Sequence, residues 1–236
     1  MLATLVLVLI AAFFVGKALG IDRDLRRLLG VGTAICGGSA IAALAGAIDA
    51  PQADVAYALA AVFLFNVVAV FVFPPLGHVL HLSQQAFGLW AGTAINDTSS
   101  VVAAAFAYGG AAGAYAVIVK LTRTTLIVPL VGFYAGKRAF ALRGERAVHW
   151  AEIVPWFVLW FVAAAALNSM GVIPHAWHAP LRSLALFSIA VALAGVGLNA
   201  EYARIRATGV RPLVLGAILW AVIATSALAI AHAVHL

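Results

Sequence analysis

The most polar stretch within the apolar parts of this sequence is residues 96–100, which read Asn-Asp-Thr-Ser-Ser. An amide, a carboxylate and three hydroxyl groups follow one another directly, with apolar sequence on both sides. Such groups bind ions and small polar solutes, because they donate and accept hydrogen bonds where the surroundings offer none. The stretch is therefore a candidate solute-binding segment, with Asn96, Asp97, Thr98, Ser99 and Ser100 as its candidate residues.

A second segment repeats the sequence that precedes this cluster. Residues 32–35 and 92–95 both read Gly-Thr-Ala-Ile. In the earlier copy the residues that follow are Cys36, Gly37, Gly38 and Ser39, which we add to the candidate binding residues. Each glycine costs a helix about 1 kcal/mol relative to alanine. Two interpretations stay open here: a close contact between helices at small residues, or a helix that is interrupted in the membrane.

The composition indicates that both segments belong to an integral membrane protein. Hydrophobic residues make up 65% of the 236 residues and charged residues 9%, whereas soluble domains contain about 25% charged residues. The net charge of +6 is then expected to reflect basic loops at an anionic lipid surface, not binding to nucleic acid. The single cysteine excludes a disulfide framework and a cysteine-rich metal site. We expect no metal and no cofactor.

The apolar runs predict about eight membrane-spanning helices, since each span needs about 20 apolar residues. The predicted spans are residues 2–19, 28–48, 55–73, 84–108, 114–136, 152–170, 181–200 and 212–234. Alternation of these spans places ten Lys and Arg residues on one side and only Arg182 on the other. The basic side is therefore predicted to face the cytoplasm. We also expect Pro74 and Pro75 to end the third span, with His78 and His81 in the loop that follows.

Three ionisable residues are predicted to lie at membrane depth, namely Asp97, Lys120 and Arg123. Each such residue costs about 2.5–3.5 kcal/mol on insertion scales, so function is the default hypothesis for it. If both repeats interrupt their helices, the half-helices that begin near Ser39 and Thr98 would aim their N-termini at an anion. Lys120 or Arg123 would add positive charge, and Asp97 would carry the coupling proton or cation. The alternative is a buried ion pair that locks Asp97 to Lys120 or Arg123.

Several motifs resemble the YeiH-type sulfate exporter family of bacterial inner-membrane proteins. The resemblance rests on residues 29–43, 88–103, 120–123 followed by Pro129, 155–174 and 195–211. It implies an all-α, multi-pass transporter of the sodium/proton antiporter and bile-acid symporter superfamily, with crossed broken helices in a five-helix inverted repeat. The sequence adds a weak sign of that repeat, because Gly30-Val31-Gly32 recurs as Gly195-Val196-Gly197.

The resemblance also has two departures. Family members commonly carry His-Asp where this chain has Asn96-Asp97, so a proton-relay histidine is not expected here. They are also longer at the N-terminus, which implies that residues 1–236 form a single transmembrane domain without the N-terminal spans usual in the family.

The leading functional prediction is a secondary transporter that exports a small anion, sulfate or an organosulfonate. The second is a proton- or sodium-coupled cation antiporter centred on Asp97. A third is a non-transporting membrane subunit. A homo-oligomer is compatible with each of them. An enzyme is not expected, because the sequence has no His-Glu-x-x-His motif and no second acidic residue at membrane depth.

Overall fold

The computed structural model describes residues 1–141, 156–174, 176–181, 183–184, 187, 191 and 209–233. These residues form helices and turns without strands, so the chain is an all-α protein within this range. The helices are α1 (Leu2–Ala18), α2 (Arg23–Ala34), α3 (Gly38–Ile48), α4 (Gln52–Val79), α5 (Gln84–Ala94), α6 (Thr98–Tyr108), α7 (Gly110–Thr124), α8 (Ile127–Ala141), α10 (Trp156–Ser169) and α13 (Arg211–Ala233).

Three of the described helical segments are long and apolar enough to cross a membrane, namely Gln52–Val79, Gly110–Arg138 and Arg211–Ala233. Shorter apolar helices accompany them, at Leu2–Ala18, Gly38–Ile48 and Thr98–Tyr108. An all-α membrane protein is thus supported, while the predicted number of eight spans stays a prediction. Most of the predicted span 181–200, with Gly195, Val196 and Gly197, lies outside the described residues.

Two predicted spans are each divided into two helices. Residues 28–48 fall on α2 and α3, and residues 84–108 fall on α5 and α6. The interruptions coincide with the repeated motifs, at Ile35–Gly37 and at Ile95–Asp97. The fifth predicted span also falls on two helices, because α7 ends at Thr124 and α8 begins at Ile127.

The expectation that Pro74 and Pro75 end a helix is wrong. Helix α4 continues through both prolines to Val79, and His78 therefore lies in its last turn, with only His81 in the turn that follows. Proline removes a backbone hydrogen bond, but membrane helices tolerate it where neighbouring elements support the chain. Here the hydroxyl of Tyr108 donates to Gly77 O and Leu82 O, at 3.3 and 2.5 Å.

The turn between the predicted spans 84–108 and 114–136 is also shorter than expected. Helix α7 begins at Gly110, which leaves Gly109 as the junction between α6 and α7. Gly109 has an extended backbone with φ of 172° and is the cap of both helices. A single residue is therefore enough to reverse the chain, and α7 can pack back along α5 and α6.

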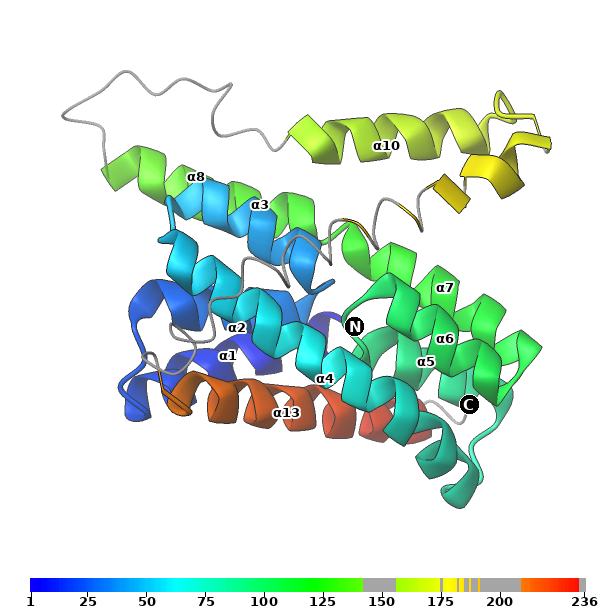
Figure 1. Ribbon diagram of the computed structural model, residues 1–236, viewed down its shortest axis with the longest axis horizontal. Coiled ribbons are helices and arrows are strands. Elements are labelled where there is room, and N and C mark those ends of the chain that lie inside the picture. The colour runs from blue at the N-terminus through cyan, green and yellow to red at the C-terminus, as the bar shows by residue number, and fades with distance from the viewer. Residues whose placement is uncertain are drawn as a thin grey trace.

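The helices pack in two groups that meet along α4 and α13 (Figure 1). Helix α1 packs on α2 and α13, whereas α5 and α6 pack on α7. The α5–α7 contact is very close at Gly92, where an added Cβ would lie 2.7 Å from the carbonyl oxygen of Ala116. Helices α2 and α6 both contact α4, and this arrangement brings the two interruptions to the centre of the bundle.

Candidate functional site

The two helix interruptions meet beside the middle of α4. The side-chain oxygen of Asn66 in α4 accepts hydrogen bonds from the backbone N–H groups of Asn96 and Asp97, at 3.0 and 3.4 Å. A Cβ on Gly37 would lie 3.5 Å from Cβ of Asn96 and 3.8 Å from Nδ2 of Asn66. The interruption between α2 and α3, the one between α5 and α6, and Asn66 are therefore in contact. We call these residues the crossing: Ile35, Cys36, Gly37, Asn66, Ile95, Asn96 and Asp97.

Gly37 turns the chain from α2 into α3. Its backbone has φ of 70° and ψ of −119°, a conformation that L residues with a Cβ rarely adopt. Gly37 is the N-cap of α3 and has no side chain to cap it, but Cys36 just before it interacts with the backbone of Ala40 and the side chain of Ser39 in the first turn. The first N–H groups of an α-helix have no partners within it, so the N-terminus of α3 keeps its positive partial charge and its other first-turn donors.

Asp97 caps the other half-helix that begins at the crossing. Its Oδ2 accepts hydrogen bonds from Ser100 N at 3.0 Å, from Ser100 Oγ at 3.1 Å, and from the hydroxyl of Ser99. A carboxylate at a helix N-terminus is favourable because it faces the positive end of the helix dipole. The N-terminus of α6 is thus already occupied by a carboxylate from the chain, in contrast to that of α3.

Lys120 lies on α7, fully buried between the two interrupted helices. Its Nζ donates to Ile35 O at 2.9 Å and to Ile95 O at 3.0 Å. Both carbonyl groups belong to the residues that directly follow α2 and α5, where intrahelical partners are missing. One ammonium group therefore joins the C-terminal ends of both half-helices.

Arg123, one turn further along α7, is bound in the same way. Its Nε donates to Ala34 O at 2.9 Å, and its Nη2 donates to Ala34 O and, at 3.3 Å, to Thr33 O. The C-terminal ends of helices carry negative partial charge, which these two cations compensate. The expectation that Lys120 or Arg123 binds an anion stays a prediction. In the structure Lys120 joins the ends of α2 and α5, and Arg123 holds the end of α2 against α7.

Asp97 forms no ion pair with Lys120 or Arg123. Among the described residues the ion pairs join Arg23 and Arg27 to Asp24, and Arg138 to Asp49. The alternative of a buried lock on Asp97 therefore has no contact to support it. The hydroxyls of Ser99 and Ser100 donate hydrogen bonds to the carboxylate of Asp97 instead.

Three buried polar atoms around the crossing have no hydrogen-bond partner within the described part of the chain. They are Asn66 Nδ2, Asn96 Oδ1 and Arg123 Nη1. Buried polar groups are nearly always paired, and each exception calls for an explanation. Two of these atoms are donors and one is an acceptor, so a small polar solute could pair with them.

The sequence-predicted site residues differ in how accessible they are. Cys36, Asn96, Lys120 and Arg123 are buried, Gly38, Asp97, Thr98, Ser99 and Ser100 are half-buried, and Ser39 is exposed in the first turn of α3. Asn66 is also buried at the crossing. In the sequence its position within an apolar run suggests a contact between helices at least as much as a ligand. The only sequence signal for it is an amide in the middle of a predicted span.

No group of three or more His, Cys, Asp or Glu residues suited to a metal ion occurs in the described ranges. The donors at the crossing are backbone N–H groups, amides and cationic side chains. This set suits an anion, which accepts hydrogen bonds from all of them. The acceptors available for a cation are the carboxylate of Asp97 and the side-chain oxygen of Asn96.

A family model described as "Conserved hypothetical protein 698" matches residues 1–216 of the chain. A UPF0324 membrane protein of Clostridium tetani is 38% identical over 233 residues, covering 93% of this chain and 68% of that relative. A UPF0324 membrane protein of Vibrio vulnificus is 39% identical over 222 residues, covering 93% of this chain and 70% of the relative. A third, of Streptococcus mutans, is 38% identical over 243 residues, covering 98% and 71%. No solved structure matches the chain significantly.

Proposed function

The chain belongs to the family described as Conserved hypothetical protein 698, whose relatives are named as membrane proteins, and we propose that it is a secondary transporter of a small anion. Sulfate or an organosulfonate is the proposed substrate class, with export across the bacterial inner membrane as the proposed direction. The observation that carries the proposal is the crossing, where a helix N-terminus without a charged cap lies beside buried polar atoms that have no partner within the described part of the chain.

The N-terminus of α3 is the proposed anion-binding end. Its N-cap residue is a glycine without a side chain, and its first turn carries Gly38 and Ser39, whose backbone N–H groups and hydroxyl are donors. Ser39 is exposed, which gives a solute access to this end. The free donor atoms of Asn66 and Arg123 add to the positive character of the crossing. Cys36 and Asn96 would line the inner side of the bound solute.

Asp97 is the proposed coupling residue. Its carboxylate lies at the crossing and caps α6, so it occupies the second helix N-terminus as an anion. Two negative charges repel each other strongly in a low-dielectric site. Protonation of Asp97, or binding of a cation to it, would therefore favour entry of the substrate anion. This arrangement links anion movement to a proton or sodium ion.

The second candidate function is a proton- or sodium-coupled cation antiporter. It is favoured by the one carboxylate at the crossing, which has hydroxyl partners but forms no ion pair among the described residues. In that case Asp97 would bind the transported cation itself, and the N-terminus of α3 would have no ligand. A non-transporting membrane subunit is the third possibility, which predicts no flux of either kind.

A substitution at Ser39 separates binding from folding. An aspartate in the first turn of α3 stabilises the helix by about 0.3–1 kcal/mol, because it faces the positive end of the dipole. The same carboxylate repels an anion from the proposed site. Ser39→Asp is therefore expected to melt at or above the temperature of the unchanged protein and to lose anion flux, whereas neutral Ser39→Asn keeps the flux.

The measurement is flux of labelled sulfate and of a labelled organosulfonate in proteoliposomes, under imposed proton and sodium gradients. Sulfate or sulfonate flux that depends on the chain and is lost in Ser39→Asp supports the proposal. Sodium–proton exchange without movement of any anion overturns it in favour of the antiporter. Equal anion flux in Ser39→Asp and Ser39→Asn also overturns it, because the charge at α3 would then be irrelevant.

A further inference from the structure

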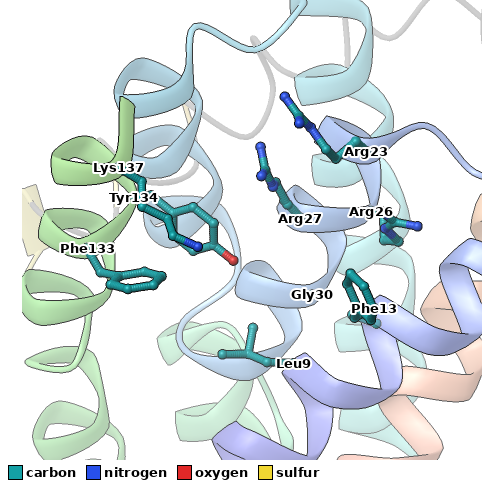
Figure 2. A pocket seen from close by; sticks show the side chains of 10 residues that line it. Leu9, Phe13, Arg23, Arg26, Arg27, Gly30, Phe133, Tyr134 and Lys137 are labelled. Atoms are coloured by element: carbon teal, nitrogen blue, oxygen red, sulfur yellow. The ribbon is translucent and has the colours of Figure 1, made fainter. Parts of the chain in front are cut away.

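A second polar feature lies outside the crossing, between α1, α2 and α8. It is a pocket of about 220 Å³, and Figure 2 shows the side chains that line it. Arg23, Arg26 and Arg27 come from the first turns of α2, and Lys137 comes from α8. The floor and walls are apolar, with Leu9 and Phe13 of α1 and Phe133 of α8 among them. We call it the basic pocket.

The charge of the basic pocket is strongly positive. Arg27 pairs with Asp24 at 3.0 Å and Arg23 approaches the same carboxylate at 3.8 Å, whereas Arg26 and Lys137 have no ion pair within the described ranges. Four cationic side chains and no carboxylate of the described residues line the pocket, while the carboxylates of Asp22, Asp24 and Asp54 gather near the N-terminus of α2. Like charges held together in this way favour a polyanionic or phosphate-bearing ligand.

Aromatic rings hold these cations at the pocket wall. The guanidinium of Arg26 lies 5.3 Å from the centre of the Phe13 ring, and that of Arg27 lies 5.6 Å from the Tyr134 ring. The ammonium of Lys137 lies 4.9 Å from the centre of the Phe133 ring. Cation–π contacts of this kind keep a cation in place while its remaining donors stay free for a ligand.

The same rings are exposed on the apolar side. Phe13 is 52% exposed and Phe133 is 57% exposed, and both continue the apolar outer faces of α1 and α8. In a membrane protein such faces contact acyl chains. The basic pocket is therefore amphipathic: a positively charged end near the helix termini is joined to apolar walls that are open to the bilayer.

We propose that the basic pocket binds one anionic phospholipid. The phosphate group lies against Lys137, while Arg26, beside Phe13 on the opposite side of the pocket (Figure 2), adds positive charge at a distance. The acyl chains follow Phe13 and Phe133. Basic pockets between membrane helices bind anionic headgroups through their charge. A free phosphate ion would use the cations but not the exposed apolar walls, so the pocket fits a lipid better than an inorganic anion.

The test uses the full chain, purified in a neutral detergent, and counts bound lipids by native mass spectrometry. Phosphatidylglycerol and phosphatidylcholine with identical acyl chains are titrated separately. The variant Arg26→Gln/Lys137→Gln removes two pocket cations that have no described ion-pair partner. The matched control Lys17→Gln/Arg211→Gln removes two exposed cations that do not line the pocket. The charge-preserving variant Arg26→Lys/Lys137→Arg shows whether substitution at these two positions disturbs folding when the charge is kept.

The unchanged chain is expected to bind one phosphatidylglycerol in preference to phosphatidylcholine. Each basic side chain at an anionic surface contributes about a fivefold factor in affinity, so the pocket double variant is expected to lose roughly 30-fold. The control and the charge-preserving variant keep the preference, and millimolar inorganic phosphate does not displace the lipid.

Three results would overturn the proposal. The first is equal binding of the two lipids by the unchanged chain. The second is an equal loss in the pocket variant and its matched control, which would indicate a diffuse charge effect. The third is displacement of the lipid by inorganic phosphate, which would indicate a site for a free anion.

Discussion

Replacement of Gly37 by alanine tests the interruption between α2 and α3 most sharply. The backbone of Gly37 has φ of 70° and ψ of −119°, which alanine adopts only with strain of about 1–3 kcal/mol. A Cβ at this position would make nearly ordinary contacts, 3.3 Å from Val62 and 3.5 Å from Asn96, so strain dominates over overlap. Alanine also lowers the entropy of the unfolded chain by about 0.4–1 kcal/mol, which offsets part of the strain. Taken at the middle of each range, the strain outweighs the entropy gain, and the net loss of stability is about 1–2 kcal/mol.

Two other glycines of α3 supply matched controls. Gly46 is exposed within the helix, and a Cβ there would meet nothing within 4 Å. Gly46→Ala should therefore gain about 0.5–1 kcal/mol from helix propensity. Gly38 is the first residue of α3, and its added Cβ would touch only the ends of the Phe63 and Leu59 side chains, at 3.3 and 3.4 Å. Gly38→Ala is expected to be about neutral.

The assay is thermal unfolding of the purified variants in one detergent at one scan rate. For a chain of this size, 1 kcal/mol moves the midpoint by about 2–4 °C. Gly37→Ala should thus melt about 2–8 °C lower and Gly46→Ala about 1–4 °C higher. A continuous helix in close contact with a neighbour would make Gly37→Ala and Gly38→Ala equally costly. That result, or a Gly37→Ala midpoint at or above that of the unchanged chain, would refute the reasoning.

Three further predictions concern the groups that surround the crossing. Lys120→Met should lower the free energy of unfolding by about 1–3 kcal/mol, because the loss of two hydrogen bonds from a charged donor outweighs the removed cost of burying the ammonium group. Lys17→Met at the exposed end of α1 is the control. Equal denaturation midpoints for the two variants would contradict the role of Lys120. Gly92→Ala should cost about 1–3 kcal/mol, because its Cβ would lie 2.7 Å from the backbone of α7; Gly132→Ala, with nothing within 4 Å, should be neutral or stabilising in the same melting assay. Asp97→Asn should keep the cap of α6, since asparagine caps as well as aspartate, and should change stability by less than about 1 kcal/mol. The same variant should remove the proton dependence of any flux in proteoliposomes, and flux that still follows the proton gradient would argue against Asp97 as the coupling residue.

The positions of the two interruptions could be predicted from the sequence because their residues disfavour a helix in lipid. Two adjacent glycines at Gly37 and Gly38, and the pair Asn96-Asp97 before three hydroxyl residues, are local signals. The predicted half-helix starts, near Ser39 and Thr98, lie within one residue of the observed starts at Gly38 and Thr98. The sequence alone did not decide between a close contact and an interruption at Gly37, since glycine serves both.

The partners of the buried cations could not be predicted in the same way. Charge and depth single out Lys120 and Arg123, but their bonds to Ile35 O and Ala34 O join residues far apart in the chain. Every residue has a backbone carbonyl group, so the sequence does not show which of them act as acceptors. The role of Asn66 could not be predicted for a similar reason, because it depends on the N–H groups of the interruption between α5 and α6.

The course of α4 depends likewise on its neighbours. A pair of prolines normally predicts a helix end, yet α4 passes through Pro74 and Pro75 while Phe73 stacks on Trp90 at 4.2 Å. The stacked rings and the hydroxyl of Tyr108 hold the last turns of α4 against α5 and α6. Such contacts arise only once distant segments have been placed together.

The most direct test of the central claim is a crystal structure of the chain grown with selenate, which has the shape and charge of sulfate and a strong anomalous signal. An anomalous peak is expected at the crossing, within hydrogen-bond reach of the N-terminus of α3 and of Asn66 Nδ2. In Ser39→Asp crystals under the same conditions the peak should be absent. A structure at saturating selenate without a peak at the crossing, or with equal peaks in both proteins, would contradict the proposal that this site binds the transported anion.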